Sequence, residues 1–101
     1  MFKIYLDFIK GRYIDNFEKL FSKYTKIKYS TVVVNGTAAL HLALLALDIK
    51  SGDEVIVPTF TYVASVNAIK YVNAKPIFID SDLNDWQLSI NEIEKKITKK
   101  T

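Results

Sequence analysis

The sequence predicts an α/β fold: a partial parallel sheet with flanking helices. Short β-branched or apolar runs at residues 31–34, 54–57 and 76–79 each stop at a turn residue or a proline. Segments of helical composition or spacing separate these runs along the chain. Strands that alternate with helices imply right-handed crossovers and parallel pairing. We therefore expect a sheet of three parallel strands.

The first two predicted helices differ in character. Residues 13–24 carry apolar side chains three and four positions apart with charges between them, the pattern of an amphipathic helix, and Gly11 can break or cap it. Residues 37–47 are rich in Ala and Leu, which favours helix. Because this second helix is apolar almost all round, we expect it to be buried on more than one side.

Two more helices follow the later strands. Residues 61–72 form the third predicted helix, and a last short helix runs to about Lys96. Ser89 and Glu92 are three positions apart, which resembles a capping box at the start of the last helix. The predicted alternation of strands and helices ends one helix after the third strand, where such a sheet normally continues. The expected organisation is a single incomplete domain over residues 1–101.

Composition narrows the function classes. The chain has 101 residues, half of them hydrophobic and a quarter charged, with no Cys and a net charge of +3. Four lysines near the C-terminus have no aromatic residue between them, so we interpret them as a solvated helix face and expect no nucleic-acid partner: Lys95, Lys96, Lys99 and Lys100.

The longest apolar run, residues 38–47, is about half of a bilayer span. The start of the chain lacks a signal-peptide cleavage site, so we expect a cytoplasmic protein.

Ligands of parallel sheets collect at the carboxyl ends of the strands. There, Gly36 allows close approach to the backbone, and Thr37 and Ala38 open a helix whose free N–H groups attract an anion. The Thr37 hydroxyl adds a further donor to a phosphate. The alternative is that Thr37 only caps the helix.

Other side chains at this edge have two interpretations each. Tyr62 could lie flat on a planar cofactor or pack into the core. Asp80 and Asp82 could be acid–base groups or metal ligands, or could cap the turn after the third strand. The lone histidine, His41, lies inside an apolar helix and could be catalytic, but a core or interface position fits it better. These residues make no catalytic set and no metal site.

Several blocks resemble the sugar-nucleotide aminotransferases of the DegT/DnrJ/EryC1/StrS family, which are fold-type-I enzymes dependent on pyridoxal phosphate (PLP). The strongest are residues 34–44 (VNGTAALHLAL) and 52–69 (GDEVIVPTFTYVASVNAI). Residues 11–18 and 76–82 extend the likeness, and with residues 86–87 and 96–98 they bring it nearest to the GDP-perosamine synthase subgroup. The fold this implies is the N-terminal part of the large domain of such a transferase.

The resemblance assigns roles by position. Gly36, Thr37 and Ala38 match the turn that holds the cofactor phosphate, and Tyr62 matches the aromatic residue that stacks on the pyridine ring. The family transfers an amino group, usually from glutamate, to a keto-sugar nucleotide, and its members are homodimers. Its catalytic lysine and its carboxylate at the ring nitrogen match no position of this chain. Asp48 stands where the family often has a helix-ending glycine, in a left-handed conformation that Asp tolerates.

Three readings of the function remain open. The first is an N-terminal fragment of an aminotransferase that makes GDP-perosamine, inactive alone. The second is a relative acting on another sugar nucleotide, or a related dehydratase in which the catalytic lysine is replaced. The third is a non-catalytic binding or interaction domain that uses the same half-sheet, with an exposed edge strand.

Overall fold

The computed structural model of the chain describes residues 11–101. The expectation about a signal peptide concerns residues outside this range. The chain divides into two compact units between Val33 and Val34, and each unit is described by itself.

The first unit contains helix α2 (Arg12–Thr25), which confirms the predicted amphipathic helix. Gly11 is its N-cap residue, and the Gly11 carbonyl accepts a hydrogen bond of 2.8 Å from the N–H of Ile14. No residue of α2 is buried. Its large apolar side chains are 43–85% exposed: Tyr13, Ile14, Phe17, Leu20, Phe21 and Tyr24.

The predicted strand at residues 31–34 is wrong, because this segment is irregular in the structure. The N–H of Val32 donates to Oε1 of Glu18 at 2.8 Å, and the hydroxyl of Ser30 donates to the Glu18 carbonyl at 2.6 Å. A strand needs a neighbouring strand to satisfy its backbone groups. Within the described residues, no strand lies beside residues 31–34. The side chain and the carbonyl of Glu18 in α2 accept hydrogen bonds from Val32 and Ser30 instead.

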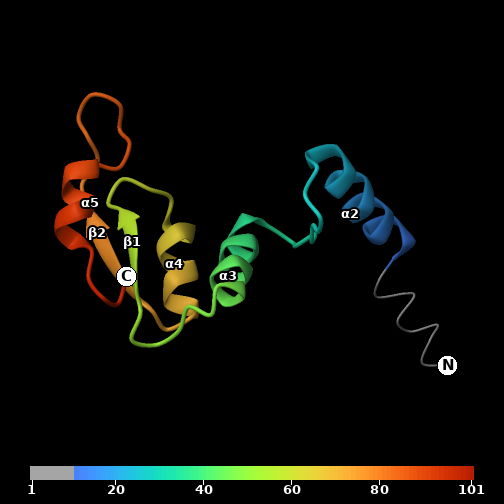
Figure 1. The fold of residues 1–101 in the computed structure, drawn as a ribbon, viewed down its shortest axis with the longest axis horizontal. Coiled ribbons are helices and arrows are strands. Elements are labelled where there is room, and N and C mark those ends of the chain that lie inside the picture. Colours follow the sequence, from blue (N-terminus) through green and yellow to red (C-terminus); the bar gives the residue numbers. More distant parts are fainter. Residues whose placement is uncertain (1–10) are drawn as a thin grey trace. The chain divides into compact units, whose positions relative to one another are not determined.

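The second unit alternates helices and strands in the predicted order (Figure 1). Its elements are α3 (Gly36–Ala46), β1 (Glu54–Pro58), α4 (Val63–Tyr71), β2 (Lys75–Ile79) and α5 (Ile90–Lys96). The strands pair in parallel, with a register from Glu54 opposite Lys75 to Pro58 opposite Ile79. The α/β class with parallel strands is confirmed, although the sheet over the described residues has two strands rather than three.

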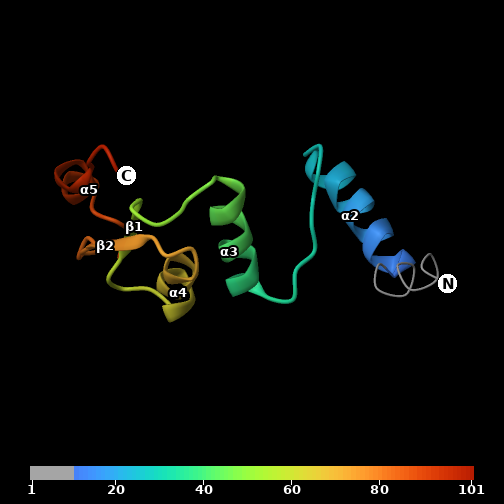
Figure 2. The same cartoon turned by 90° about the horizontal axis from the view of Figure 1, so that it is seen from below.

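The core of the second unit is built from α4, the residues directly after it and the two strands. Val57 of β1 is 3% exposed and packs with Ile69, Val72 and Ala74. Figure 2 shows α4 and α5 on opposite sides of the two strands. Both faces of the sheet therefore carry a helix, as parallel strands require.

Helix α3 is less buried than its composition predicts. None of its residues is buried, and Leu45 is 53% exposed. Within residues 11–101 its neighbour is α4, and the His41 ring meets the Tyr71 ring edge-on at 5.4 Å. The expectation of burial on several sides is therefore wrong for this part of the chain, because one helix covers only one side.

The end of α3 confirms the left-handed residue expected at Asp48, which has a φ of 58°. The N–H of Asp48 donates to the Leu45 carbonyl, and the N–H of Ile49 donates to the Leu44 carbonyl, each at 3.0 Å. This double closure is a Schellman motif. It turns the chain so that Ile49 and Leu44 both pack against the core cluster.

The predicted capping box of α5 is only half right. Ser89 is the N-cap residue, but its side chain makes no capping hydrogen bond. The Glu92 carboxylate accepts instead from the Lys95 ammonium at 2.6 Å, within reach on the same helix face. Lys95 and Lys96 are exposed on α5, as expected of a solvated helix face, whereas Lys99 and Lys100 are exposed but follow the end of the helix, so the prediction is wrong for these two. Among residues 11–101, no helix combines the length and the apolar character needed to cross a membrane.

Candidate functional site

The candidate residues of the second unit lie at the starts of α3 and α4 and after the ends of the strands. β1 and β2 end side by side at Pro58 and Ile79. In Figure 1 the starts of α3 and α4 lie at the same end as the tip of the β1 arrow. The topology therefore brings Gly36 and Thr37, which open α3, and Tyr62, which precedes α4, to one edge.

The start of α3 is capped by Asn35, not by Thr37. Oδ1 of Asn35 accepts a hydrogen bond of 2.9 Å from the N–H of Ala38, and the Asn35 carbonyl accepts from the N–H of Ala39 at 3.1 Å. Within the described residues the N–H groups of Gly36 and Thr37 and the Thr37 hydroxyl have no hydrogen-bond partner. Three donors at a helix start, aided by the helix dipole, suit a phosphate.

Gly36 fits an anion that approaches closely. Its φ does not lie in the left-handed range, so its backbone does not require glycine. Apart from its chain neighbours and the backbone of its own helix, a Cβ built there would meet no described atom within 4 Å. Neither conformation nor packing in this part of the chain explains the missing side chain. A ligand resting against the backbone would explain it.

Tyr62 presents its ring outward. It is the N-cap residue of α4, with an extended backbone at φ −68° and ψ 137°. Its carbonyl accepts a hydrogen bond of 3.1 Å from the N–H of Ser65. The side chain is 79% exposed, so the alternative of a core aromatic does not hold within the described chain. The ring is free to lie against a planar ligand.

Asp80 and Asp82 have separate structural partners. Oδ1 of Asp82 accepts from the backbone and side-chain nitrogens of Asn84 at 2.8 and 2.9 Å, which confirms the turn-capping interpretation. Oδ1 of Asp80 accepts from the Thr59 hydroxyl at 3.1 Å. Residues 11–101 contain no group of three His, Cys, Asp or Glu side chains that could hold a metal ion.

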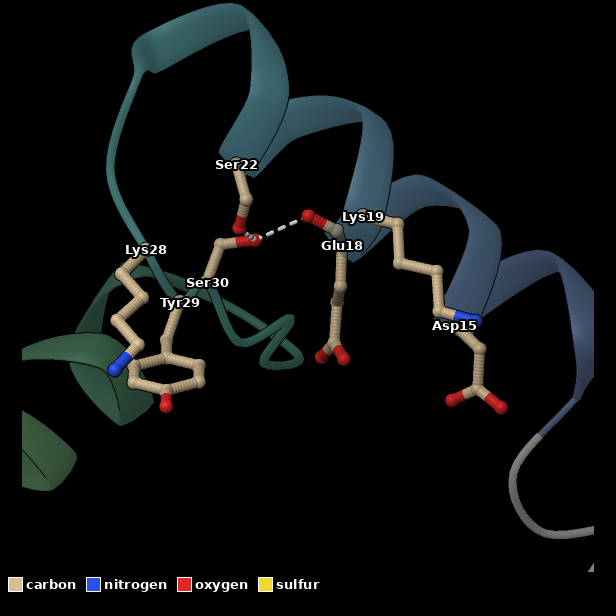
Figure 3. A pocket seen from close by; sticks show the side chains of 7 residues that line it. All are labelled: Asp15, Glu18, Lys19, Ser22, Lys28, Tyr29 and Ser30. Carbon is tan, nitrogen blue, oxygen red and sulfur yellow. Dashed lines mark hydrogen bonds between the residues drawn. The ribbon is translucent and has the colours of Figure 1, made fainter.

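One hollow lies in the first unit and has a structural explanation. It measures about 370 Å³ and lies between α2 and residues 28–30 (Figure 3). The Ser22 hydroxyl donates to Ser30 at 2.8 Å, and Ser30 donates to the Glu18 carbonyl, as drawn in Figure 3. These bonds tie the segment after α2 to the helix, and they satisfy the hydroxyls that a ligand would otherwise use.

An apolar groove of about 250 Å³ lies in the second unit between α3, α4 and β1. Leu40, Val57 and Ile69 are among its lining residues. It has no charged lining residue, so it suits packing rather than phosphate binding. The polar donors at the start of α3 lie outside this groove.

Sequence reasoning missed three features at the carboxyl edge. Asn35 belongs to the residue types that favour N-cap positions, so its place just before Gly36 could have identified it. The Thr59–Asp80 bond and the contact between the Phe60 and Trp86 rings join residues 21 or more positions apart. No local pattern predicts such pairs.

Comparisons with known proteins agree with this architecture. The model of the DegT/DnrJ/EryC1/StrS aminotransferase family matches residues 6–101. The chain is 63% identical over 92 residues to a GDP-perosamine synthase of Escherichia coli O157:H7, an alignment that covers 91% of this chain and 25% of the relative. The chain thus spans about a quarter of the length of this relative.

Solved structures give the same result. A putative sugar aminotransferase from Streptococcus pneumoniae, in its PLP form, matches with a TM-score of 0.85 and 36% identity over 90% of this chain and 23% of that one. A GDP-4-keto-6-deoxymannose-3-dehydratase with a trapped PLP-glutamate species matches with a TM-score of 0.80 and 28% identity, over 90% of this chain and 25% of that one. These structures confirm PLP as a cofactor of the parent family. The chain belongs to the DegT/DnrJ/EryC1/StrS aminotransferase family.

Proposed function

We propose that this chain forms part of a PLP-dependent aminotransferase that transfers an amino group to a 4-keto-6-deoxy sugar nucleotide, in the synthesis of GDP-perosamine for polysaccharides such as O-antigen. The observation that carries the proposal is the start of α3, where the donors of Gly36 and Thr37 have no partner among residues 11–101, together with the exposed Tyr62 ring at the start of α4. The likeness to a GDP-perosamine synthase supports this choice of sugar nucleotide.

In this proposal the chain binds the cofactor and orients it. The N–H groups of Gly36 and Thr37, with the Thr37 hydroxyl, hold the phosphate. Ala38 belongs to the same turn, but its N–H already donates to Asn35, so it contributes to the phosphate only if Asn35 releases it. Tyr62 covers one face of the pyridine ring and excludes water from that face.

When bound, PLP supplies the electron sink that makes amino transfer possible. We assign no catalytic residue to this chain, whose part is to position the ring and its phosphate. Glutamate as the amino donor, a homodimeric assembly, a cytoplasmic location and a single incomplete domain over residues 1–101 belong to the same proposal.

A second candidate is a related sugar-nucleotide enzyme that removes a hydroxyl group instead of transferring an amino group. The structural likeness to the 3-dehydratase favours it, although at lower identity than the aminotransferases. Gly36, Thr37 and Tyr62 would bind the cofactor in the same way in both. A non-catalytic binding module is the third reading, and it predicts that these residues have no effect on PLP.

A chimera tests the proposal directly. The 92 aligned residues of the Escherichia coli O157:H7 GDP-perosamine synthase are replaced by the matching residues of this chain. We expect the purified chimera to retain PLP, seen as a visible absorption band, and to aminate the GDP-linked 4-keto-6-deoxymannose. Thr37→Val should weaken PLP binding, and Thr37→Ser, which keeps the hydroxyl, should not. A folded chimera without PLP would contradict the proposal.

A further inference from the structure

The loop at residues 59–62 carries an exposed ring on a fixed backbone. Tyr62 is 79% exposed, yet its carbonyl is bound to the N–H of Ser65 in the first turn of α4. Just before it, the Thr61 and Ser65 hydroxyls lie 3.2 Å apart. The α4 side of the loop is thus anchored, and its other side must be anchored too if the ring is to keep one direction.

Thr59 anchors the other side to the end of β2. Its N–H donates to the Ile79 carbonyl at 2.9 Å, and its hydroxyl donates to Oδ1 of Asp80 at 3.1 Å. The regular pairing of the strands ends at Pro58 and Ile79. The Thr59 bonds therefore extend the link between the two chain segments by one residue, through a side chain, at the point where the sheet stops.

Phe60 adds a second contact between the same two segments. Its ring centroid lies 5.2 Å from that of Trp86. Trp86 has a φ of 61°, a left-handed conformation that is costly for a bulky residue and persists only where other contacts impose it. Those contacts are present: the N–H of Trp86 donates to the Asp82 carbonyl at 3.0 Å, and Ser81 pairs with Leu88 in an antiparallel bridge.

We propose that Thr59 and Asp80 are positioning residues, which together with the Phe60–Trp86 contact hold the 59–62 loop so that the Tyr62 ring faces the cofactor. This inference rests on the proposed function, in which Tyr62 covers the pyridine ring. Asp80 and Trp86 act through Tyr62 and touch neither cofactor nor substrate. The loop at residues 81–88 then holds the 59–62 loop in place through the contact between Trp86 and Phe60.

The first test follows amide hydrogen exchange in the 101-residue chain. Thr59→Val removes the donor with little change of shape, and Thr59→Ser keeps it. We expect Thr59→Val to speed exchange of the Ser65 amide about tenfold, as expected from the loss of one hydrogen bond to a carboxylate. Thr59→Ser and Asp80→Asn, which keep donor and acceptor, should match the parent chain. Unchanged exchange in Thr59→Val would overturn the proposal.

A double-mutant cycle in the chimera separates positioning from general stability. Thr59→Val should weaken PLP binding about tenfold and reduce the circular dichroism of the bound cofactor. In a Tyr62→Ala background the same substitution should have no further effect on PLP affinity, because its target is already absent. An equal loss in both backgrounds would show that Thr59 acts on the fold rather than through Tyr62, and would overturn the inference.

Different results would contradict the cofactor contact of Tyr62 and the positioning role of Thr59. If Tyr62→Ala leaves PLP affinity and the cofactor's circular dichroism unchanged, the proposed contact of Tyr62 is wrong and the inference falls with it. If Tyr62→Ala weakens PLP binding but Thr59→Val does not, only the positioning role is wrong.

Discussion

The side chain of Asn35 accepts a hydrogen bond from the backbone N–H of Ala38, at 2.9 Å, and so closes the first turn of α3. The cap comes from the residue directly before Gly36 and Thr37. It orders the turn while leaving their N–H groups without partners in the described chain. Cap and candidate phosphate site therefore share one turn and divide its donors between them.

Asn35 gives the first prediction. Asn35→Ala removes the cap and should destabilise the chain by about 1 kcal/mol, measured by thermal unfolding. Asn35→Asp keeps a capping oxygen and should leave the unfolding temperature close to that of the parent. Its negative charge, however, stands beside the proposed phosphate, so PLP affinity of the chimera should fall. Equal PLP affinity for Asn35→Asp and the parent would place the phosphate elsewhere.

Gly36 gives a prediction in which stability and binding move apart. A Cβ at this position meets no described atom, and the backbone is not left-handed. Gly36→Ala should therefore leave the unfolding temperature of the chain unchanged or slightly higher, since Ala restricts the unfolded state. PLP affinity of the chimera should drop, because the methyl group occupies the space of the phosphate. A drop in stability with intact PLP binding would indicate a purely structural glycine.

Glu54 makes stability depend on pH. The Thr98 hydroxyl donates to its carboxylate at 2.8 Å and the Lys75 ammonium approaches at 3.3 Å, which together hold the pKa of Glu54 below its ordinary value of 4.5. A carboxyl whose pKa is lowered by folding stabilises the fold fully above its unfolded pKa, and this stabilisation is lost as the pH falls through the folded value.

We therefore expect the unfolding temperature to fall as the pH drops below about 4.5, the ordinary pKa of Glu54. Glu54→Gln should lower stability at pH 7 and reduce this acid dependence. Thr98→Val is the matched variant. It removes the hydroxyl that contributes most to the lowered pKa of Glu54, and it keeps the carboxylate. Lys50 and Lys95 lower the pKa values of Asp48 and Glu92 in the same direction, so some acid dependence should persist. An unchanged acid profile in Glu54→Gln would refute the assignment.

Asp48 tests the backbone at the end of α3. Its φ of 58° is a conformation that glycine adopts without cost. Asp48→Gly should raise the unfolding temperature although it removes the exposed ion pair with Lys50, because such pairs contribute little. Asp48→Val should lower it, since a β-branched side chain opposes this conformation. The reverse order of the two variants would show that the Schellman closure does not control this helix end.

Local patterns predicted most of the elements but not their partners. The spacing of Phe17 and Leu20 located α2, and Pro58 marked the end of β1. Residues 31–34 have strand composition, yet a strand forms only with a neighbour, and that information is not local. The exposure of Leu45 has the same origin: the apolar sequence of α3 shows that a surface needs cover but not which segment provides it.

In the candidate site, too, local patterns indicated single residues but not the contacts between distant ones. Gly36, Thr37 and Tyr62 could be named from the turn pattern and the family resemblance, and the starts of α3 and α4, where they stand, lie at the same end as the tip of β1. The Thr59–Asp80 bond depends on which strands pair and in which register. The sequence supplies both side chains, but only the fold brings them to hydrogen-bonding distance.

The cofactor site is tested most simply by the PLP content of the chimera, compared with that of its Thr37→Val and Tyr62→Ala variants, from the visible absorption of the purified proteins. We expect about one PLP per chain in the chimera and a clear loss in both variants, with similar unfolding temperatures of the apoproteins. PLP content that is unaffected by either substitution would contradict the assignment of this sheet edge as the cofactor site.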